Sequence, residues 1–290
     1  MRQSLQILLV LLLVLLAGIA GYMLLFGQGR ADRLEVLEAQ GQVMRTAEGG
    51  APTPLAVGDQ IGAREGVEVA DGARAVLGLG EGTRLELESA TSVRVLGVDA
   101  SGVRVELEQG RVRARVRAGG QPLGLSSRGR AIYADDADFS AAVDPDGALQ
   151  VEAERGRLRL EGVGEGINQL EPGRQVVSMP GGDPVLGAVS SELLLEVGWP
   201  EQDSTRMADL LVQGRTGPYA SVRVGRGEDW REVRADAQGI FQASVPLDEG
   251  GNAVRVQARD ALGRTREDEA EIERDSQPPA IGGSEVQWGP

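Results

Sequence analysis

The chain has 290 residues, of which 41% are hydrophobic and 26% charged, and its formal net charge is −14. This acidic balance argues against nucleic-acid binding, because the neutralisation of phosphates by cationic side chains supplies most of that affinity. Cysteine, histidine and lysine are all absent, so disulfides, cysteine-ligated zinc, imidazole catalysis and Schiff-base chemistry are excluded. Only carboxylate pairs or a calcium site remain chemically open, and we expect no catalytic residue, cofactor or metal.

The first element is apolar. From Ile7 to Phe26 there are 20 residues without a charge, which at about 1.5 Å per residue would span a hydrocarbon core of about 30 Å. We expect a transmembrane anchor over residues 1–27, followed by a linker over residues 28–33. The alternative is a cleaved signal peptide with Gly18 and Ala20 before the cut, but such apolar regions usually run about 7 to 15 residues.

Residues 34–180 show a period of two, with apolar and polar side chains in alternation, which is typical of β-strands. Asp-Gly and Gly-x-Gly turns separate the runs. This region is predicted to be an all-β domain of several hairpins or solenoid-like coils, with strands over residues 36–45, 67–70, 74–79, 83–87, 92–98, 139–143 and 148–160.

The stretch over residues 103–117 has the clearest alternation. Val103, Val105 and Leu107 alternate with charged residues, and after Gly110 the alternation resumes with Val112, Ala114 and Val116. We expect two strands that meet at a tight turn or bulge at Gly110, with one apolar and one charged face.

Six short phrases stand out in this region: Gly41-Gln42-Val43, Pro54-Leu55-Ala56-Val57-Gly58-Asp59, Gly72-Ala73-Arg74-Ala75-Val76-Leu77, Gly82-Thr83-Arg84-Leu85, Leu107-Glu108-Gln109-Gly110-Arg111-Val112 and Glu154-Arg155-Gly156-Arg157-Leu158. In their order and spacing they resemble the FecR domain, which is found in periplasmic parts of iron-siderophore sigma-factor regulators and in other bacterial envelope proteins. The resemblance implies a periplasmic β domain. The family's sigma regulators carry a cytoplasmic domain before the membrane helix, whereas six residues precede Ile7 here, so direct sigma-factor control is not expected.

A Gly-Gly-Asp-Pro break opens a predicted linker over residues 181–191. Beyond it, residues 192–275 contain seven short alternating runs, the number and spacing of an immunoglobulin-like sandwich, and residues 276–290 form a tail. The segment resembles bacterial Ig-like repeats of secreted and surface proteins. In that family an Asp-x-x-Gly-x-Phe turn is structural, with Asp236 accepting backbone N–H bonds and Gly239 taking a positive φ.

Candidate binding residues lie in two places. Arg111, Arg113, Arg115 and Arg117 alternate along one strand and would form a basic ladder for an anionic ligand or partner. The alternative, which we weigh more heavily, is that a turn at Gly110 sets Arg111 and Arg113 opposite Glu108 and Glu106 as structural cross-strand ion pairs. Trp288 in the tail is a second candidate partner contact.

Other polar clusters favour structural roles. The aspartates at positions 135, 136, 138, 144 and 146 lack the spacing of known calcium loops and are predicted to form a solvated acidic loop. The carboxylates at positions 267–271 alternate along a predicted strand and do not form a catalytic pair. Trp199 and Trp230 are expected to pack in the core of the second domain.

The sequence therefore predicts a non-catalytic, single-pass protein of the bacterial inner membrane whose bulk lies in the periplasm and binds or scaffolds an envelope protein partner. Signal cleavage would instead give a secreted or surface protein. The alternative function is binding of an envelope polymer, either peptidoglycan or polysaccharide, through the arginine ladder and the tryptophans. An enzyme is the least favoured class.

Overall fold

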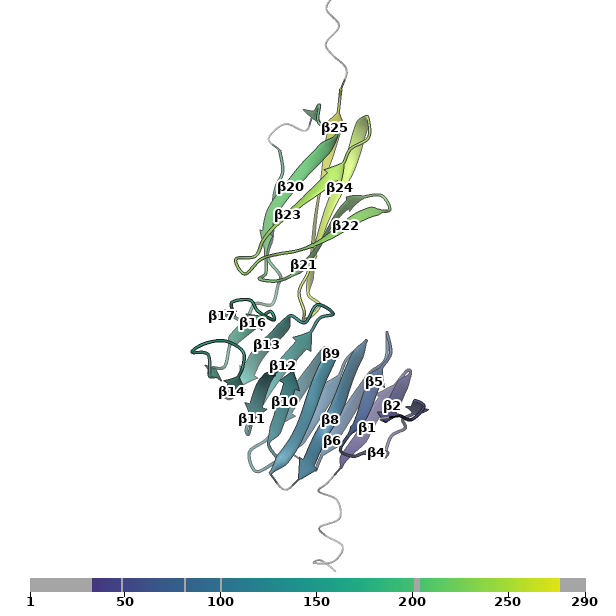
Figure 1. The fold of residues 1–290 in the computed structure, drawn as a ribbon, viewed down its shortest axis with the longest axis vertical. Helices are drawn as coiled ribbons and strands as arrows, with labels where there is room; N and C mark the ends of the chain where they lie inside the picture. Colours follow the sequence, from purple (N-terminus) through teal and green to yellow (C-terminus); the bar gives the residue numbers. More distant parts are fainter. Residues whose placement is uncertain (1–32, 48, 81, 100, 201–203, 277–290) are drawn as a thin grey trace, which may run out of the picture. The chain divides into compact units, whose positions relative to one another are not determined.

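The computed structural model describes residues 33–47, 49–80, 82–99, 101–200 and 204–276. These residues divide into two compact units, one up to Val189 and one from Ser190 onward. Every regular element of both units is a β-strand, which confirms the all-β fold class (Figure 1). Within the described residues there is no helix of the length and apolarity needed to cross a membrane. The predicted anchor and most of the tail lie outside these residues.

The first unit has seventeen strands in two layers. Layer A has the order β4-β1-β6-β7-β9-β12-β13-β16-β17, and its strands are β1 (Leu34–Gln40), β4 (Gln60–Ile61), β6 (Arg74–Leu79), β7 (Thr83–Leu87), β9 (Gly102–Val116), β12 (Ala137–Val143), β13 (Leu149–Arg155), β16 (Arg174–Ser178) and β17 (Val185–Ala188).

Layer B has the order β3-β2-β5-β8-β9-β10-β11-β14-β15. Its remaining strands are β2 (Val43–Ala47), β3 (Thr53–Pro54), β5 (Glu65–Val69), β8 (Thr91–Asp99), β10 (Leu123–Ser127), β11 (Arg130–Ala134), β14 (Leu158–Glu161) and β15 (Gln169–Leu170). The inward side chains of the two layers form one apolar core, so each layer covers the other's apolar face.

Strand β9 belongs to both layers. Its first half pairs with β8 and β10 in layer B, and its second half pairs with β7 and β12 in layer A (Figure 1). Val105 in the first half and Ala114 in the second are both fully buried in the same core. The offset between the two apolar series thus marks a strand that passes from one wall of the core to the other.

The passage occurs at Gly110, which has a φ of +89°. A bulge on β9 precedes it, because Ser92 pairs with Gln109 while Val93 pairs with Leu107. The backbone pairing of β9 with β8 stops at Gln109, and its pairing with β7 starts at Val112. Between them, the buried Thr91 hydroxyl accepts a hydrogen bond from the Arg111 N–H at 3.0 Å and donates one to the Arg111 carbonyl at 3.2 Å. A Cβ at Gly110 would lie 2.5 Å from the Cα of Thr91, so only glycine fits this close approach.

Several sequence expectations need correction. No hairpin forms at Gly110, and β9 continues as one strand of 15 residues. The run predicted over residues 36–45 is two strands, β1 and β2, separated at Gly41, whose φ is +74°. Strands β10 and β11 were not predicted. Strand β17 lies in the predicted linker over residues 181–191 and pairs with β16, since the Gly-Gly-Asp-Pro segment is the turn between these two strands.

The buried Arg130 connects the two layers at one end of the core. Its guanidinium donates to the carbonyl oxygens of Ser178 at 2.8 Å, Gly147 at 2.8 Å and Ser127 at 3.3 Å. These carbonyls belong to the end of β16, the β12–β13 turn and the end of β10, so both layers contribute. Burial lowers the pKa of Arg130 from its ordinary value, but the side chain is held by oxygen acceptors in three directions.

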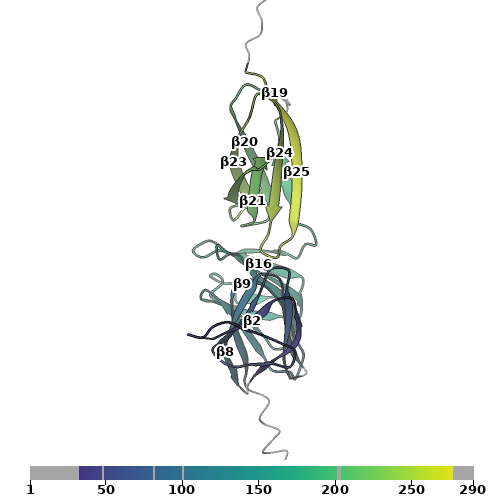
Figure 2. The same ribbon diagram turned by 90° about the vertical axis from the view of Figure 1, so that its right-hand side faces the viewer.

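The second unit consists of two sheets around a core of its own. One sheet has the order β18 (Leu195–Gly198), β20 (Asp209–Thr216) and β23 (Ile240–Pro246), and the other has the order β19 (Ser204–Thr205), β25 (Thr265–Arg274), β24 (Gly250–Arg259), β21 (Ser221–Arg226) and β22 (Asp229–Arg234). Figure 2 shows strands of both sheets side by side. Val212 and Phe241 from the first sheet pack with Val256 from the second. The seven predicted strands are all present.

A five-residue turn of the form Asp-x-x-Gly-x recurs three times, beginning at Asp144, Asp236 and Asp260. Each aspartate accepts the backbone N–H of the residue four positions later, at 2.8 to 2.9 Å, and donates its own backbone N–H to that residue's carbonyl. The glycine has a positive φ in every case, +79° at Gly239. The predicted role of Asp236 and Gly239 is confirmed, and the same turn occurs in both units.

We expect Gly110→Ala to destabilise the first unit more than Gly119→Ala. Both glycines have a positive φ, which costs an L-residue about 1 to 2 kcal/mol. A Cβ at Gly119 meets no atom within 4 Å, whereas one at Gly110 overlaps Thr91, which adds about 1 to 3 kcal/mol. Urea unfolding of the two variants checks the difference, and equal losses would contradict the proposed close approach.

We expect Arg130→Met to lower the free energy of unfolding by about 2 to 4 kcal/mol, because three carbonyl groups lose their donor in a buried place. Arg157→Met is the matched control, since Arg157 is 60% exposed and its loss should change stability by less than about 1 kcal/mol. Urea denaturation measures both. A similar loss of unfolding free energy in the two variants would show that Arg130 does not stabilise the contact between the layers.

Candidate functional site

The predicted arginine ladder lies on the outer face of layer A. Arg111, Arg113 and Arg115 project from the second half of β9, opposite to the buried Val112 and Ala114, and Arg117 follows the strand end. Their partners are not Glu106 and Glu108, because these two residues lie in the first half of β9, which pairs in layer B. Glu108 is instead paired with Arg94 at 2.6 Å.

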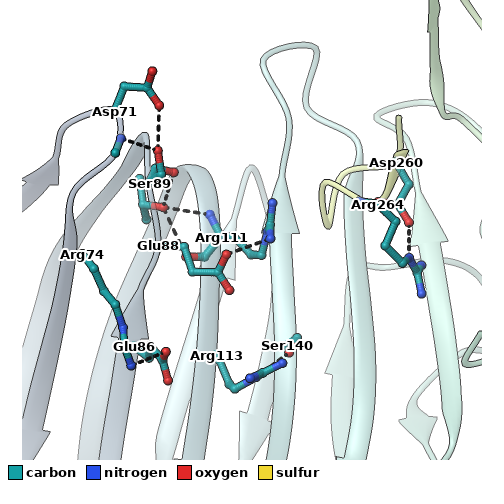
Figure 3. A network of polar contacts seen from close by, with 12 residues as sticks. Asp71, Arg74, Glu86, Glu88, Ser89, Arg111, Arg113, Ser140, Asp260 and Arg264 are labelled. Carbon is teal, nitrogen blue, oxygen red and sulfur yellow. Dashed lines mark hydrogen bonds and ion pairs between the residues drawn. The ribbon is translucent and has the colours of Figure 1, made fainter. Parts of the chain in front are cut away.

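Several arginines of this face have a carboxylate partner, and two of these pairs are drawn in Figure 3. Arg111 contacts Glu88 at 2.7 Å, and Arg74 on β6 contacts Glu86 at 2.5 Å. Arg113 lies 3.4 Å from Glu154 and from the Ser140 hydroxyl. These contacts connect β6 and β9 with other strands of layer A or with their ends, and Arg113 reaches past β12 to Glu154 on β13. This part of the ladder therefore has a structural explanation.

Asp138 on β12 is the centre of a second group. Its carboxylate accepts hydrogen bonds from Arg117 at 2.5 Å and from Arg155 at 3.2 Å, and Arg155 also contacts Asp136 at 2.7 Å. Burial alone would raise the pKa of Asp138, but the hydrogen bonds from Arg155 and Arg117 outweigh it and hold the pKa below its usual value. Asp138 therefore stays ionised and fully engaged.

Arg115 and Arg84 differ from their neighbours. They are direct cross-strand partners on β9 and β7, and both are exposed. Among the described residues, neither side chain has an ion pair or a hydrogen bond with another group. Asp138 lies opposite Arg115 on β12, but its two oxygens are taken by Arg117 and Arg155. Two like charges thus face each other without compensation, which is unfavourable for folding.

A hollow of about 390 Å³ lies at the end of these strands. It is lined by Leu79, Gly80, Gly82, Arg117, Ala118, Gly119, Gly120 and Gln121. The Arg117 N–H donates to the Gly82 carbonyl at 2.9 Å, two positions beyond the Arg84–Arg115 pair. A Cβ at Gly82 would lie 2.6 Å from the Cα of Gly120, so the two backbones touch and keep this place free of side chains.

The other predicted clusters have structural partners. Asp136 and Asp138 pair with arginines, and Asp144 closes its turn on Ala148. Within the described ranges no three acidic side chains are placed to hold a metal ion together. Trp199 packs against the core of the second unit, and its indole N–H donates a hydrogen bond to the Asp268 carboxylate at 3.2 Å. Trp230 is half-buried, and Cζ of Arg223 lies over its ring at 5.0 Å from the centroid. Trp288 lies outside the described residues.

The central part of the first unit matches a known protein family. Residues 65–159 match the family model described as FecR protein. The match begins with β5 and ends within β14, so it includes β9, both of its neighbours in each layer and the arginine face. This segment, about a third of the chain, is similar to the FecR family. The expected resemblance is thereby confirmed for this segment.

Comparison with solved structures finds two crystal structures of a candidate anti-sigma factor from Parabacteroides distasonis ATCC 8503. Sequence identity is 20% and 19%, and the TM-score is 0.38 in both cases. Each match covers 42% of this chain and 59% of the other, so the chain spans less than two thirds of the length of that protein. No curated protein matches the chain.

Sequence reasoning found Arg115 but missed Arg84. Alternation over residues 83–87 places Arg84 on the outer face, as for every second residue of a strand. Its importance depends on which strand lies beside β7, and that pairing joins residues about 30 positions apart in the chain. No local pattern carries this information.

We expect the stability of the first unit to fall in acid through Asp138. A carboxylate whose pKa is depressed in the folded state contributes stability above its unfolded pKa of about 3.9, and this is lost as pH falls through the folded value. Asp138→Asn should therefore cost about 1 to 2 kcal/mol at pH 7, and less at pH 3. Asp136→Asn is the control, because Asp136 is 48% exposed and should cost under about 1 kcal/mol. Urea unfolding between pH 3 and 7 tests this, and a loss independent of pH would refute it.

Proposed function

We propose that this protein is a non-catalytic, membrane-anchored cell-envelope protein that binds or scaffolds a protein partner outside the cytoplasm, in envelope signalling. The observation that carries the proposal is the FecR match over residues 65–159, which covers most of the strands that build the shared core and the charged outer face. Domains of this family are generally non-catalytic. The absence of histidine, cysteine and lysine from the chain agrees with that role.

The proposal includes an Ig-like identity for the second unit. Seven strands and one short strand form two sheets around a single core, and the turn at Asp236 has the hydrogen bonds expected for bacterial Ig-like repeats. Such a unit would extend or present the FecR domain to its partner. The proposed anchor from Ile7 to Phe26 would hold both units at the inner membrane, in the periplasm.

Binding of an envelope polymer is the competing function. The sequence argument for it was the arginine ladder together with the tryptophans. In the structure, however, Arg111, Arg113 and Arg117 are each paired with a carboxylate. Trp199 and Trp230 are half-buried, and both make intramolecular contacts. The described residues therefore favour a protein partner.

Photo-crosslinking in cells tests the proposed function. Amine-reactive reagents are unsuitable, because the chain has no lysine and therefore a single primary amine, at its N-terminus. A benzophenone amino acid placed in full-length protein at Leu96, which is 45% exposed on layer B, and separately at Ile240, 55% exposed on the second unit, avoids this problem. We expect a discrete protein adduct from at least one position that persists in high salt. Adducts with glycan fragments alone would overturn the proposal in favour of the polymer binder.

A further inference from the structure

We propose that Arg84 and Arg115 form a binding site for carboxylate side chains of the protein partner. This inference rests on the proposed function and names the chemistry by which the partner would be recognised. Its starting point is the uncompensated pair of like charges on the outer face of layer A. A pair that is unfavourable in the free protein is expected where a ligand supplies the missing charge.

The local charge is opposite in sign to that of the whole chain. Four arginines, at positions 84, 115, 117 and 155, surround two aspartates, at positions 136 and 138, which leaves a local surplus of two positive charges. The chain as a whole carries −14. A ligand with one or two anionic groups is neutralised at this place, whereas a long polyanion would be repelled by the remainder of the surface.

The rest of the site also favours a peptide over a free inorganic anion. Gly78 lies opposite Arg84 on β6, and the side chain of Leu37 occupies the space above it, since a Cβ there would be 2.7 Å from Cδ1 of Leu37. An apolar contact is thus available on one side of Arg84. On the other side lies the hollow beside Arg117. A segment with acidic and apolar residues matches both features.

The spacing fits an extended segment. Side chains that are directly opposite on neighbouring strands have Cβ atoms about 4.5 to 5.5 Å apart, and alternate residues of an extended peptide lie about 6.6 Å apart on one face. Two glutamates separated by one residue can therefore each reach one guanidinium. Guanidinium and carboxylate groups also match in planar geometry, which favours paired hydrogen bonds.

The test is an NMR titration of full-length protein with a synthetic peptide that carries Glu-Leu-Glu between glycine and serine residues. The arginine Nε–H signals are observed, and those of Arg84 and Arg115 are identified by their loss in single variants. We expect these two signals to shift, and affinity to fall about tenfold or more in the double variant Arg84→Gln/Arg115→Gln, since two charge pairs are lost. A Gln-Leu-Gln peptide should produce no shift.

The matched control is the double variant Arg157→Gln/Arg159→Gln, which has the same change in net charge at exposed arginines that are already paired with Glu171 and Glu161. Its affinity should stay within about twofold of the original. An equal loss in both double variants would show that binding is non-specific and would overturn the site. Tighter binding of inorganic phosphate than of the peptide, at equal ionic strength, would also overturn it.

Stability separates a binding site from a structural one. Because the two arginines repel each other, Arg84→Gln/Arg115→Gln should unfold at an equal or higher urea concentration than the original protein. A lower unfolding midpoint would mean that the pair has a structural role, contrary to the proposal. The proposed site can be disproved while the proposed function still holds. A crosslinked protein partner whose recovery is unaffected by the double variant disproves the site alone.

Discussion

The first unit depends on one strand that serves two layers. Because β9 pairs with four strands, two in each layer, the layers are joined by a continuous backbone and not only by side-chain packing. The close approach of Gly110 to Thr91 makes the passage possible. The position of each arginine on the outer face of layer A follows from this passage, since the bulge and corner decide which side of β9 faces solvent.

The outer face of layer A carries a local group of positively charged arginines, although the protein as a whole is acidic. Exposed ion pairs add little stability individually, but they determine which charges remain available to a ligand. Here the carboxylates of Glu88, Glu154 and Asp138 engage the arginines on either side, and Arg115 is left over. For the proposed binding of a partner, specificity would then arise from the pattern of free charges and from the space left by glycines.

Local alternation was sufficient to predict the all-β class, most strand positions and the outward direction of the arginines. It could not distinguish a hairpin at Gly110 from a single strand with a corner, because both arrangements place Leu107 and Val112 in the core. Long-range pairing decides between the two, and the same pairing decides that Arg84 faces Arg115. Strands β10 and β11 were missed because glycine, serine and arginine interrupt their alternation. The fold class was thus predictable, whereas the candidate site was only half predictable.

The sharing of β9 also has a consequence for the order in which the unit can form as the chain is synthesised. Before residues 102–116 are available, β7 and β8 are both open edges, one in each layer, and nothing in the preceding chain pairs with their free sides. Open edges of this kind promote pairing with other chains. The arrival of a single segment closes both edges together. The open edges of both layers then lie on one strand, β9, until β10 and β12 pair with its free sides.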